Sequence, residues 1–310
     1  MQQRTAMAQT IKTVALAGAT GNAGSNILTA LLDTGRFTIT VLTRKPNPNL
    51  PTSVTAQVVD FESLDSLTAA LNGQDAFIDA TSTPDSSVAI RLIDASVAAG
   101  IHRFIPAEFS IDPAATNCRA LPVFAGKAKV YDYLRQVGAA GRITYTSIST
   151  GAFLELSLRT GFVNIDIATK RIDLLNAGSR VTPWTRLSSV GSAVANALLR
   201  ADETKNRTCY VCSIMKSQRE VGELAQEALG KEGWRVQSQD AAKALEGAIA
   251  QFQVGNVTVE VIGAMIRWTL TQPESAAGWA TNDNELLGVP TMTDDEIKQL
   301  IQQIAEEMKA

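Results

Sequence analysis

The stretch Val14-Ala15-Leu16-Ala17-Gly18-Ala19-Thr20-Gly21-Asn22-Ala23-Gly24 organises this chain of 310 residues. An apolar run passes into three glycines spaced three residues apart, and a pattern of helical period follows over residues 26–32. In a strand–turn–helix setting, such glycines let the backbone approach a pyrophosphate, and the helix N-terminus offers free N–H groups. The turn is therefore predicted to bind a dinucleotide through Gly18, Thr20, Gly21, Asn22, Ala23 and Gly24. An ordinary tight turn that binds nothing is the alternative.

The first half of the chain alternates short apolar runs with amphipathic patterns. A helix is expected at 24–32, another places Leu64, Leu67 and Leu71 inward, and a further one covers 123–137. Strands are expected at 13–17, 37–42, 56–60, 76–80, 103–106 and 143–148. This alternation predicts an α/β fold, a Rossmann-like doubly wound parallel sheet with helices on both faces.

After Gly151 the regular alternation ends. Capping boxes at 217–220 and 293–296 open two helices, and a strand is expected at 209–214. Further helices are expected at 186–200, 241–252 and 261–270. We therefore expect a loose tail at 1–10 and a cofactor-binding Rossmann-like domain at 11–150. A smaller, mostly helical substrate-binding region would follow at 151–310, with 186–215 returning to the sheet.

Composition argues against several classes of protein. The net charge of −3 gives no electrostatic reason to expect a nucleic acid or an anionic membrane as partner. No apolar run approaches the roughly twenty residues that span a bilayer, and residues 1–10 lack the features of a targeting signal. Cys209 and Cys212 would point to opposite faces of a strand, and His102 is the only histidine, so no metal site is expected. A cytoplasmic protein fits this usage of cysteine.

Two cations follow the second expected strand. NAD-binding folds usually place an acidic residue there to bind the ribose 2′-OH, whereas this chain has Thr43-Arg44-Lys45. Arginine can bind a 2′-phosphate with paired N–H donors. Arg44 and Lys45 therefore favour NADP(H) over NAD(H) as cofactor, and a solvated basic loop is the alternative.

Lys127 falls on the apolar stripe of the helix at 123–137, whereas Lys129 lies on the opposite face. A partly desolvated lysine has a lowered pKa and can transfer a proton near neutral pH. The alternative is a stem that packs while the amine reaches water. The tyrosine and lysine four residues apart that short-chain dehydrogenases use are absent, because Arg135 follows Tyr131 at that spacing.

These motifs together resemble a known family. The glycine turn, Thr43-Arg44, the segment Arg103-Phe104-Ile105-Pro106-Ala107-Glu108-Phe109 and Phe124-x-x-Lys127-Ala128-Lys129-Val130 are similar to those of NmrA-like and isoflavone-reductase-like atypical short-chain dehydrogenases. The resemblance covers about residues 12–200 well and the last third loosely. It implies a two-domain monomer or homodimer that binds NADPH across the switch point of the sheet.

The resemblance also implies roles for single residues. It assigns the 2′-phosphate to Arg44 and general acid/base work to Lys127. Over the nicotinamide it places the loops that contain Thr81, Ser82, Ala107, Glu108, Phe109 and Phe153. Two departures concern the substrate: Tyr131-Asp132 replace a basic pair of the plant enzymes, and Ser110 replaces their glycine.

The sequence thus predicts an NADP(H)-dependent reductase of a small aromatic or conjugated secondary metabolite. Phe153 follows the sixth expected strand and is the aromatic residue expected at the substrate, whereas most other buried aromatics simply pack. The alternatives are a non-catalytic cofactor-sensing regulator of the NmrA type, and an isomerase or cyclase that uses bound NADP(H). A lysine on the apolar face favours the enzyme, because a sensor has no need of a partly desolvated amine.

Overall fold

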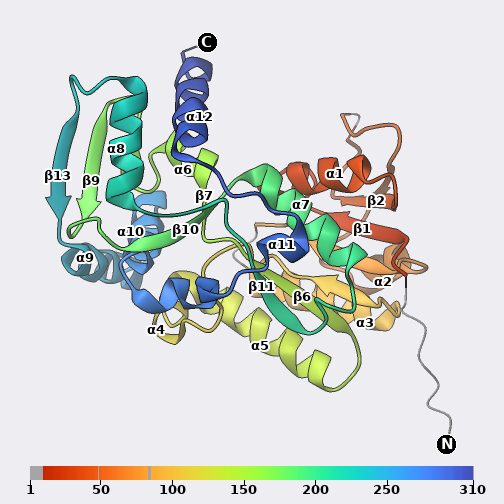
Figure 1. Ribbon diagram of the computed structural model, residues 1–310. Helices are drawn as coiled ribbons and strands as arrows, with labels where there is room; N and C mark the ends of the chain where they lie inside the picture. Colours follow the sequence, from red (N-terminus) through yellow and green to blue (C-terminus); the bar gives the residue numbers. More distant parts are fainter. Residues whose placement is uncertain (1–9, 48, 83–84, 310) are drawn as a thin grey trace, which may run out of the picture.

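The structure is a computed structural model that describes residues 10–47, 49–82 and 85–309 (Figure 1). The tail predicted at 1–10 lies, apart from Thr10, outside these residues. The described chain forms one seven-stranded sheet flanked by helices, and a second region with two three-stranded sheets.

The strands of the central sheet are β1 (Thr13–Ala17), β2 (Thr38–Thr43), β3 (Thr55–Val58), β4 (Ala76–Asp79), β5 (Arg103–Ile105), β6 (Thr144–Ser149) and β11 (Arg207–Tyr210). Their order is β11-β6-β5-β4-β1-β2-β3, and every neighbouring pair is parallel. The strand order therefore reverses between β1 and β4. Open α/β sheets bind ligands at such a switch point, beyond the carboxyl ends of the strands.

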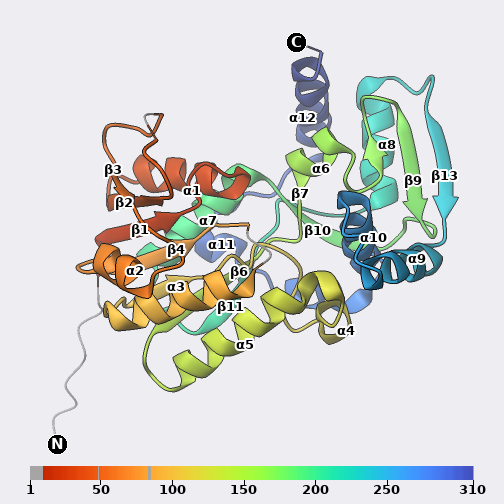
Figure 2. The same ribbon diagram turned by 180° about the vertical axis from the view of Figure 1, so that it is seen from behind.

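Helices cover both faces of this sheet (Figures 1 and 2). They are α1 (Asn22–Asp33), α2 (Leu64–Leu71), α3 (Ser86–Ala98), α5 (Ala125–Ala139) and α7 (Leu187–Leu199). Val14 and Leu16 of β1 pack with residues of α1 and α7, whereas Ala15 and Ala17 pack with residues of α2, α3 and α5. Because alternate residues of a strand face opposite sides, β1 is buried on both. The predicted fold class is confirmed.

One predicted core residue is exposed. Leu64 is the first residue of α2, and 43% of its surface is accessible. Ser63 caps this helix by accepting a hydrogen bond from the Ser66 backbone N–H at 3.2 Å. The buried residues of the helix are Leu67, Ala70 and Leu71. Leu64 therefore lies outside the buried face, and its predicted inward orientation is wrong.

The second region contains strands that the sequence pattern does not reveal. One sheet, in the order β12-β10-β7, consists of β7 (Ala152–Phe153), β10 (Val181–Thr185) and β12 (Ile214–Ser217). The other, in the order β13-β9-β8, consists of β8 (Ile165–Asp166), β9 (Arg171–Leu175) and β13 (Arg235–Gln239). Of these strands, only the start of β12 falls within a predicted one.

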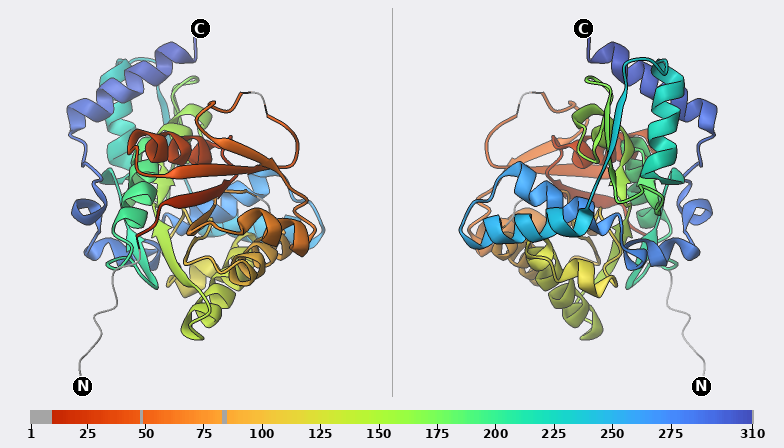
Figure 3. Two further views of the ribbon diagram at one scale, coloured as in Figure 1. Left: turned by 90° about the vertical axis from the view of Figure 1, so that its right-hand side faces the viewer. Right: turned by 90° about the vertical axis from the view of Figure 1, so that its left-hand side faces the viewer.

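Helices complete the second region, and both predicted capping boxes are present, at the starts of α8 and α12. The longer helices are α6 (Leu154–Thr160), α8 (Gln218–Leu229), α9 (Ala241–Gln253), α10 (Val259–Thr269) and α12 (Asp294–Glu307). Short helical segments are α4 (Thr116–Arg119), η1 (Pro122–Phe124), η2 (Pro273–Ala280) and α11 (Asn284–Leu287). α12 packs against α8 and α6 (Figure 3).

The second region packs on the segment that follows the carboxyl end of β5. Ile111 and Phe124 belong to that segment, and they share an apolar cluster with Ala248 of α9 and Met265 of α10. The segment after β5 therefore lies against the helix pair of α9 and α10.

The strand predicted at 209–214 is two strands in different sheets. β11 ends at Tyr210 and pairs with β6, whereas β12 begins at Ile214 and pairs antiparallel with β10. Cys209 and Cys212 are buried free thiols, and burial raises their pKa values to about 12 and about 11. The described residues contain no cluster of metal-ligating side chains. No described helix has the length and apolarity needed to cross a membrane.

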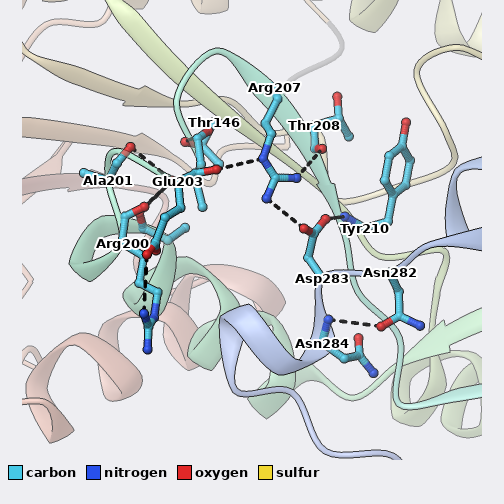
Figure 4. Close-up of polar contacts among 12 residues, drawn as sticks. Thr146, Arg200, Ala201, Glu203, Arg207, Thr208, Tyr210, Asn282, Asp283 and Asn284 are labelled. Atoms are coloured by element: carbon cyan, nitrogen blue, oxygen red, sulfur yellow. Dashed lines mark hydrogen bonds and ion pairs between the residues drawn. The ribbon is translucent and has the colours of Figure 1, made fainter.

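The edge strand β11 is covered by the segment before and within α11 (Figure 4). The Asp283 carboxylate accepts hydrogen bonds from the Arg207 guanidinium at 2.7 Å and from the Tyr210 backbone N–H at 2.8 Å. The Asn284 side chain accepts from the Cys212 N–H at 3.0 Å and donates to the Cys212 carbonyl at 2.7 Å. The bond to the Tyr210 N–H satisfies a backbone group that an open edge would leave unpaired, and the bonds to Cys212 hold the chain just beyond the strand.

Candidate functional site

Two glycines of the turn after β1 lie where no side chain fits. Gly18 has φ +80°, and a Cβ there would lie 2.4 Å from the carbonyl oxygen of Ala80. A Cβ on Gly24 would lie 1.9 Å from the carbonyl oxygen of Gly18. The turn therefore needs glycine both to adopt its backbone conformation and to bring α1 close to β1.

The N-terminus of α1 is free to bind an anion. Its N-cap is Gly21, so no side chain caps the first N–H groups, and the first turn contains no acidic residue. The Gly21 N–H itself closes the turn by donating to the Gly18 carbonyl at 3.0 Å. Uncapped N–H groups and the positive end of the helix dipole are together suited to phosphate.

A cavity of about 960 Å³ opens beside this turn, bounded by the ends of β2 and β4. Predicted cofactor residues that line it are Gly18, Thr20, Gly21, Arg44, Lys45, Thr81 and Ser82. Predicted residues outside its lining are Asn22, Ala23 and Gly24 at the start of α1, and Ala107, Glu108, Phe109, Lys127 and Phe153. The structure therefore divides the predicted site residues into two groups.

Arg44 and Lys45 lie exposed on the rim of the cavity, directly after β2. The acidic residue in the lining of the cavity is Glu62, and it forms an ion pair with Arg91 at 3.1 Å. Phe61 adds an apolar wall. Phe61 and Glu62 are not among the predicted site residues, although they directly follow the third expected strand, where the carboxyl ends of parallel strands meet.

The second group gathers around Lys127 on α5. The residue is half-buried as a whole, but its amine turns into the protein and donates a hydrogen bond to the Ala107 carbonyl. Next to Ala107, Glu108 forms a bidentate ion pair with Arg119 of α4, with Nη1–Oε2 and Nη2–Oε1 distances of 2.9 and 3.0 Å. Glu108 and Arg119 are only 1% and 5% exposed. The Glu108 carboxylate is thus occupied by an internal partner.

Burial and three charges act on Lys127. Burial lowers the pKa of its amine, the carboxylates of Glu108 and Asp79 oppose that shift, and the Arg119 guanidinium adds to it. Asp79, the last residue of β4, is 2% exposed, and burial raises the pKa of its carboxyl group. Two hydrogen bonds from Thr81 and the charge of Lys127 oppose the shift at Asp79. Asp79 is not among the predicted site residues, because no sequence spacing connects it with Lys127.

The loop after β5 is fastened to the end of β6. The Ser110 carbonyl accepts from the backbone N–H groups of Thr150 and Gly151 at 3.1 and 3.0 Å. Phe109 packs against the core that includes α1. Phe153 is half-buried in β7, just beyond Gly151. Ala107, Phe109 and Phe153 thus lie on connected segments at the carboxyl ends of β5 and β6.

Three other aromatic side chains serve the structure, namely Trp184, Trp279 and Phe162. Trp184 and Trp279 are buried, and their indole N–H groups donate to the carbonyls of Lys216 at 2.8 Å and Val211 at 2.9 Å. Phe162 lies beside the guanidinium of Arg267, with 5.9 Å between Cζ and the ring centroid. Trp268 is half-buried beside the apolar cluster of α9 and α10.

Curated relatives match almost the whole chain. The oxidoreductase aprR of Aspergillus flavus is 32% identical over 294 residues, which cover 93% of this chain and 97% of that protein. The oxidoreductase poxI of Penicillium oxalicum is 30% identical over 297 residues, which cover 93% of each.

Solved structures share the fold at lower identity. An isoflavone reductase has a TM-score of 0.73 at 21% identity and covers 94% of this chain and 99% of its own. The leucoanthocyanidin reductase of Vitis vinifera, solved with NADPH, has a TM-score of 0.71 at 16% identity and covers 93% and 99%. The triphenylmethane reductase of Citrobacter has a TM-score of 0.71 at 17% identity and covers 95% and 99%.

The family model described as the NmrA-like family matches residues 10–286, nearly the whole described chain. That range contains the glycine turn, the rim cations and the helix of Lys127. The chain belongs to the NmrA-like family.

Proposed function

We propose that this protein is an NADP(H)-dependent reductase of a small aromatic or conjugated metabolite. Two features at the carboxyl edge of the sheet carry the proposal. One is the turn at residues 18–24, here called the glycine cradle, whose close backbone contacts only glycine permits, and the other is the buried amine of Lys127. The names of the relatives, both called oxidoreductases, support the same class of activity.

The cradle and the cavity suit the cofactor. The uncapped N–H groups at the start of α1 would bind the pyrophosphate, since neither a side chain nor an acidic residue competes there. Arg44 and Lys45 on the rim would bind the 2′-phosphate, and Phe61 offers an apolar surface to a base. NADPH, when bound, supplies the hydride.

Lys127 would supply the proton. Reduction of a carbonyl or conjugated acceptor places negative charge on the substrate oxygen, and a positioned ammonium group neutralises that charge by donating its proton. Burial lowers the pKa of Lys127 and so brings its proton loss closer to neutral pH. The Ala107 carbonyl fixes the position of the amine.

The substrate class follows from the apolar surface near the start of α5. Val123, Leu245, Phe252 and Trp268 are half-buried residues around the cluster that joins the segment after β5 to α9 and α10. Such a surface suits a flat apolar ring. We infer that the substrate binds between this cluster and Phe153, with its reducible group toward Lys127.

The test is NADPH consumption with a panel of aromatic enones, quinones and lignan-like ethers. Lys127→Ala should retain NADPH binding and lose about 100-fold or more of kcat, the usual contribution of a general acid. Lys129→Ala, two residues along on the exposed side of the same helix, is the matched control and should behave as wild type.

Two outcomes would contradict the proposal. Full activity of Lys127→Ala would remove the lysine from the mechanism. Tight NADPH binding without turnover of any compound would favour a cofactor sensor.

A further inference from the structure

Asp79 occupies a special position in the sheet. It is the last residue of β4, opposite Ala17 of β1, and thus stands at the switch point where the strand order reverses. Its Oδ1 accepts hydrogen bonds from the Thr81 backbone N–H at 2.9 Å and from the Thr81 hydroxyl at 2.6 Å. Asp79 therefore shapes the cavity wall through Thr81 without lining the cavity itself.

Lys127 lies beyond the next strand. Ile78 of β4 is in register with Ile105 of β5, so Ala107 lies two residues beyond that pair, at the same edge as Asp79. The carbonyl of Ala107 holds the Lys127 amine. The charges of Asp79 and Lys127 accordingly act on each other.

Three charged groups face Lys127: Glu108 from the loop after β5, Arg119 from α4 and Asp79 from β4. Glu108 and Arg119 are bound to each other by two hydrogen bonds, and they shift the pKa of the Lys127 amine in opposite directions. Asp79 has only neutral hydrogen-bond donors, both on Thr81, among the partners that the described residues provide. Unlike the Glu108 carboxylate, the Asp79 carboxylate therefore has no ion-pair partner among the described residues.

A carboxylate in this position costs stability. Burial raises the pKa of Asp79, so ionisation of this carboxyl group is less favourable in the folded protein than in the unfolded chain. An asparagine would retain the hydrogen bonds from Thr81 without that cost. Residues that oppose stability in this way concentrate at functional sites.

We propose that Asp79 is a positioning residue of the reductase site, whose carboxylate attracts the Lys127 ammonium and so governs whether that amine carries a proton. This inference rests on the proposed function for its catalytic meaning. Its physical content is a coupling between two groups, and that coupling is measurable with or without turnover.

The direct test is NMR of protein labelled with [ε-¹³C]lysine, with the Lys127 signal identified by its loss in Lys127→Ala. Asp79→Asn should lower the titration midpoint of Lys127 by about 0.5 or more, because an attracting anion is removed. Thr81→Val, which removes one donor to the carboxylate and so favours its neutral form, should shift the midpoint in the same direction by less. Thr81→Val therefore tests the coupling between Asp79 and Lys127 even if Asp79→Asn fails to fold.

Asp112→Asn is the matched control. Asp112 is also a buried carboxylate, 3% exposed, but it accepts hydrogen bonds from the Tyr210 hydroxyl and the Gly278 N–H, both at 2.9 Å. Asp112→Asn should leave the titration midpoint of Lys127 unchanged. An unchanged midpoint in Asp79→Asn, or an equal shift in Asp112→Asn, would overturn the proposal.

Activity gives the second readout. If Lys127 donates the proton as an ammonium, Asp79→Asn should match wild type at low pH. It should fall about threefold or more below wild type at pH values above the midpoint, the fold-change that a shift of about 0.5 produces. A uniform loss at every pH would indicate a merely structural role and would contradict the inference. A shifted NMR midpoint in a protein without turnover would instead support the coupling and refute the reductase.

Discussion

Removal of the Arg119 guanidinium should expose how strongly the buried ion pair holds the loop at Lys127. In Arg119→Met the side chain keeps its apolar stem, but the Glu108 carboxylate, 1% exposed, loses both charged hydrogen bonds of 2.9 and 3.0 Å. A buried charge left without its partner costs about 3–5 kcal/mol. We therefore expect the free energy of unfolding to fall by about that amount.

Two further variants separate the charge from the packing. Glu108→Gln combined with Arg119→Met leaves no charge unpaired, so the double variant should be more stable than Arg119→Met alone by about 2 kcal/mol or more. Arg119→Lys keeps the positive charge but can make only one of the two bonds, and it should lose about 1–2 kcal/mol.

Urea unfolding followed by circular dichroism measures these differences. The same variants should also lose reductase activity, because the carbonyl that holds the Lys127 amine belongs to Ala107, the residue before Glu108. If Arg119→Met unfolds within about 1 kcal/mol of wild type, less than the loss expected for any unpaired buried charge, the ion pair does not hold this loop.

Three other predictions concern the cradle, the rim and the switch point. Gly24→Ala places a Cβ 1.9 Å from the Gly18 carbonyl oxygen and should lose about 1–3 kcal/mol in urea unfolding and weaken NADPH binding, whereas Gly247→Ala, with open space around its Cβ on α9, should gain up to about 1 kcal/mol. Arg44→Ala should raise the Kd for NADPH, measured by cofactor fluorescence, by about tenfold or more and leave the Kd for NADH nearly unchanged; equal effects on both would refute a 2′-phosphate contact. Because the folded pKa of Asp79 is raised above its ordinary value of 3.8, wild type loses stability as pH rises from that value through the folded pKa. Asp79→Asn should therefore be more stable than wild type at pH 7, and the difference should disappear below pH 3.8; a destabilised variant at pH 7 would contradict the sign.

The fold was predictable because its signals are local. The glycine turn and the alternation of apolar runs with amphipathic patterns each occupy a short window, and both family and fold class are confirmed. The strands of the second region give no such signal. β13 reads Arg-Val-Gln-Ser-Gln and is largely exposed, β10 contains Pro183, and β7 and β8 have two residues each.

The candidate site divides in the same way. Lys127 was visible because its position on an apolar stripe conflicts with its charge. Asp79 and the Glu108–Arg119 pair gain their meaning from contacts between segments that sequence spacing does not connect. Leu64 is an apolar residue that the helical pattern places in the core, but it lies in the first turn of α2, outside the buried face.

The cover of β11 by Asp283 and Asn284 bears on how the molecule can be divided. The proposed domain boundary at residue 150 would separate the glycine cradle from β11, which belongs to the same sheet. It would also separate the cradle from Asp283 and Asn284, which cover that end of the sheet. A fragment that ends at residue 150 would leave β6 as an edge strand with unpaired backbone N–H and C=O groups, which favours self-association. The two regions should therefore melt in a single cooperative step, and a dinucleotide in the cradle should protect the far C-terminal half from protease as well.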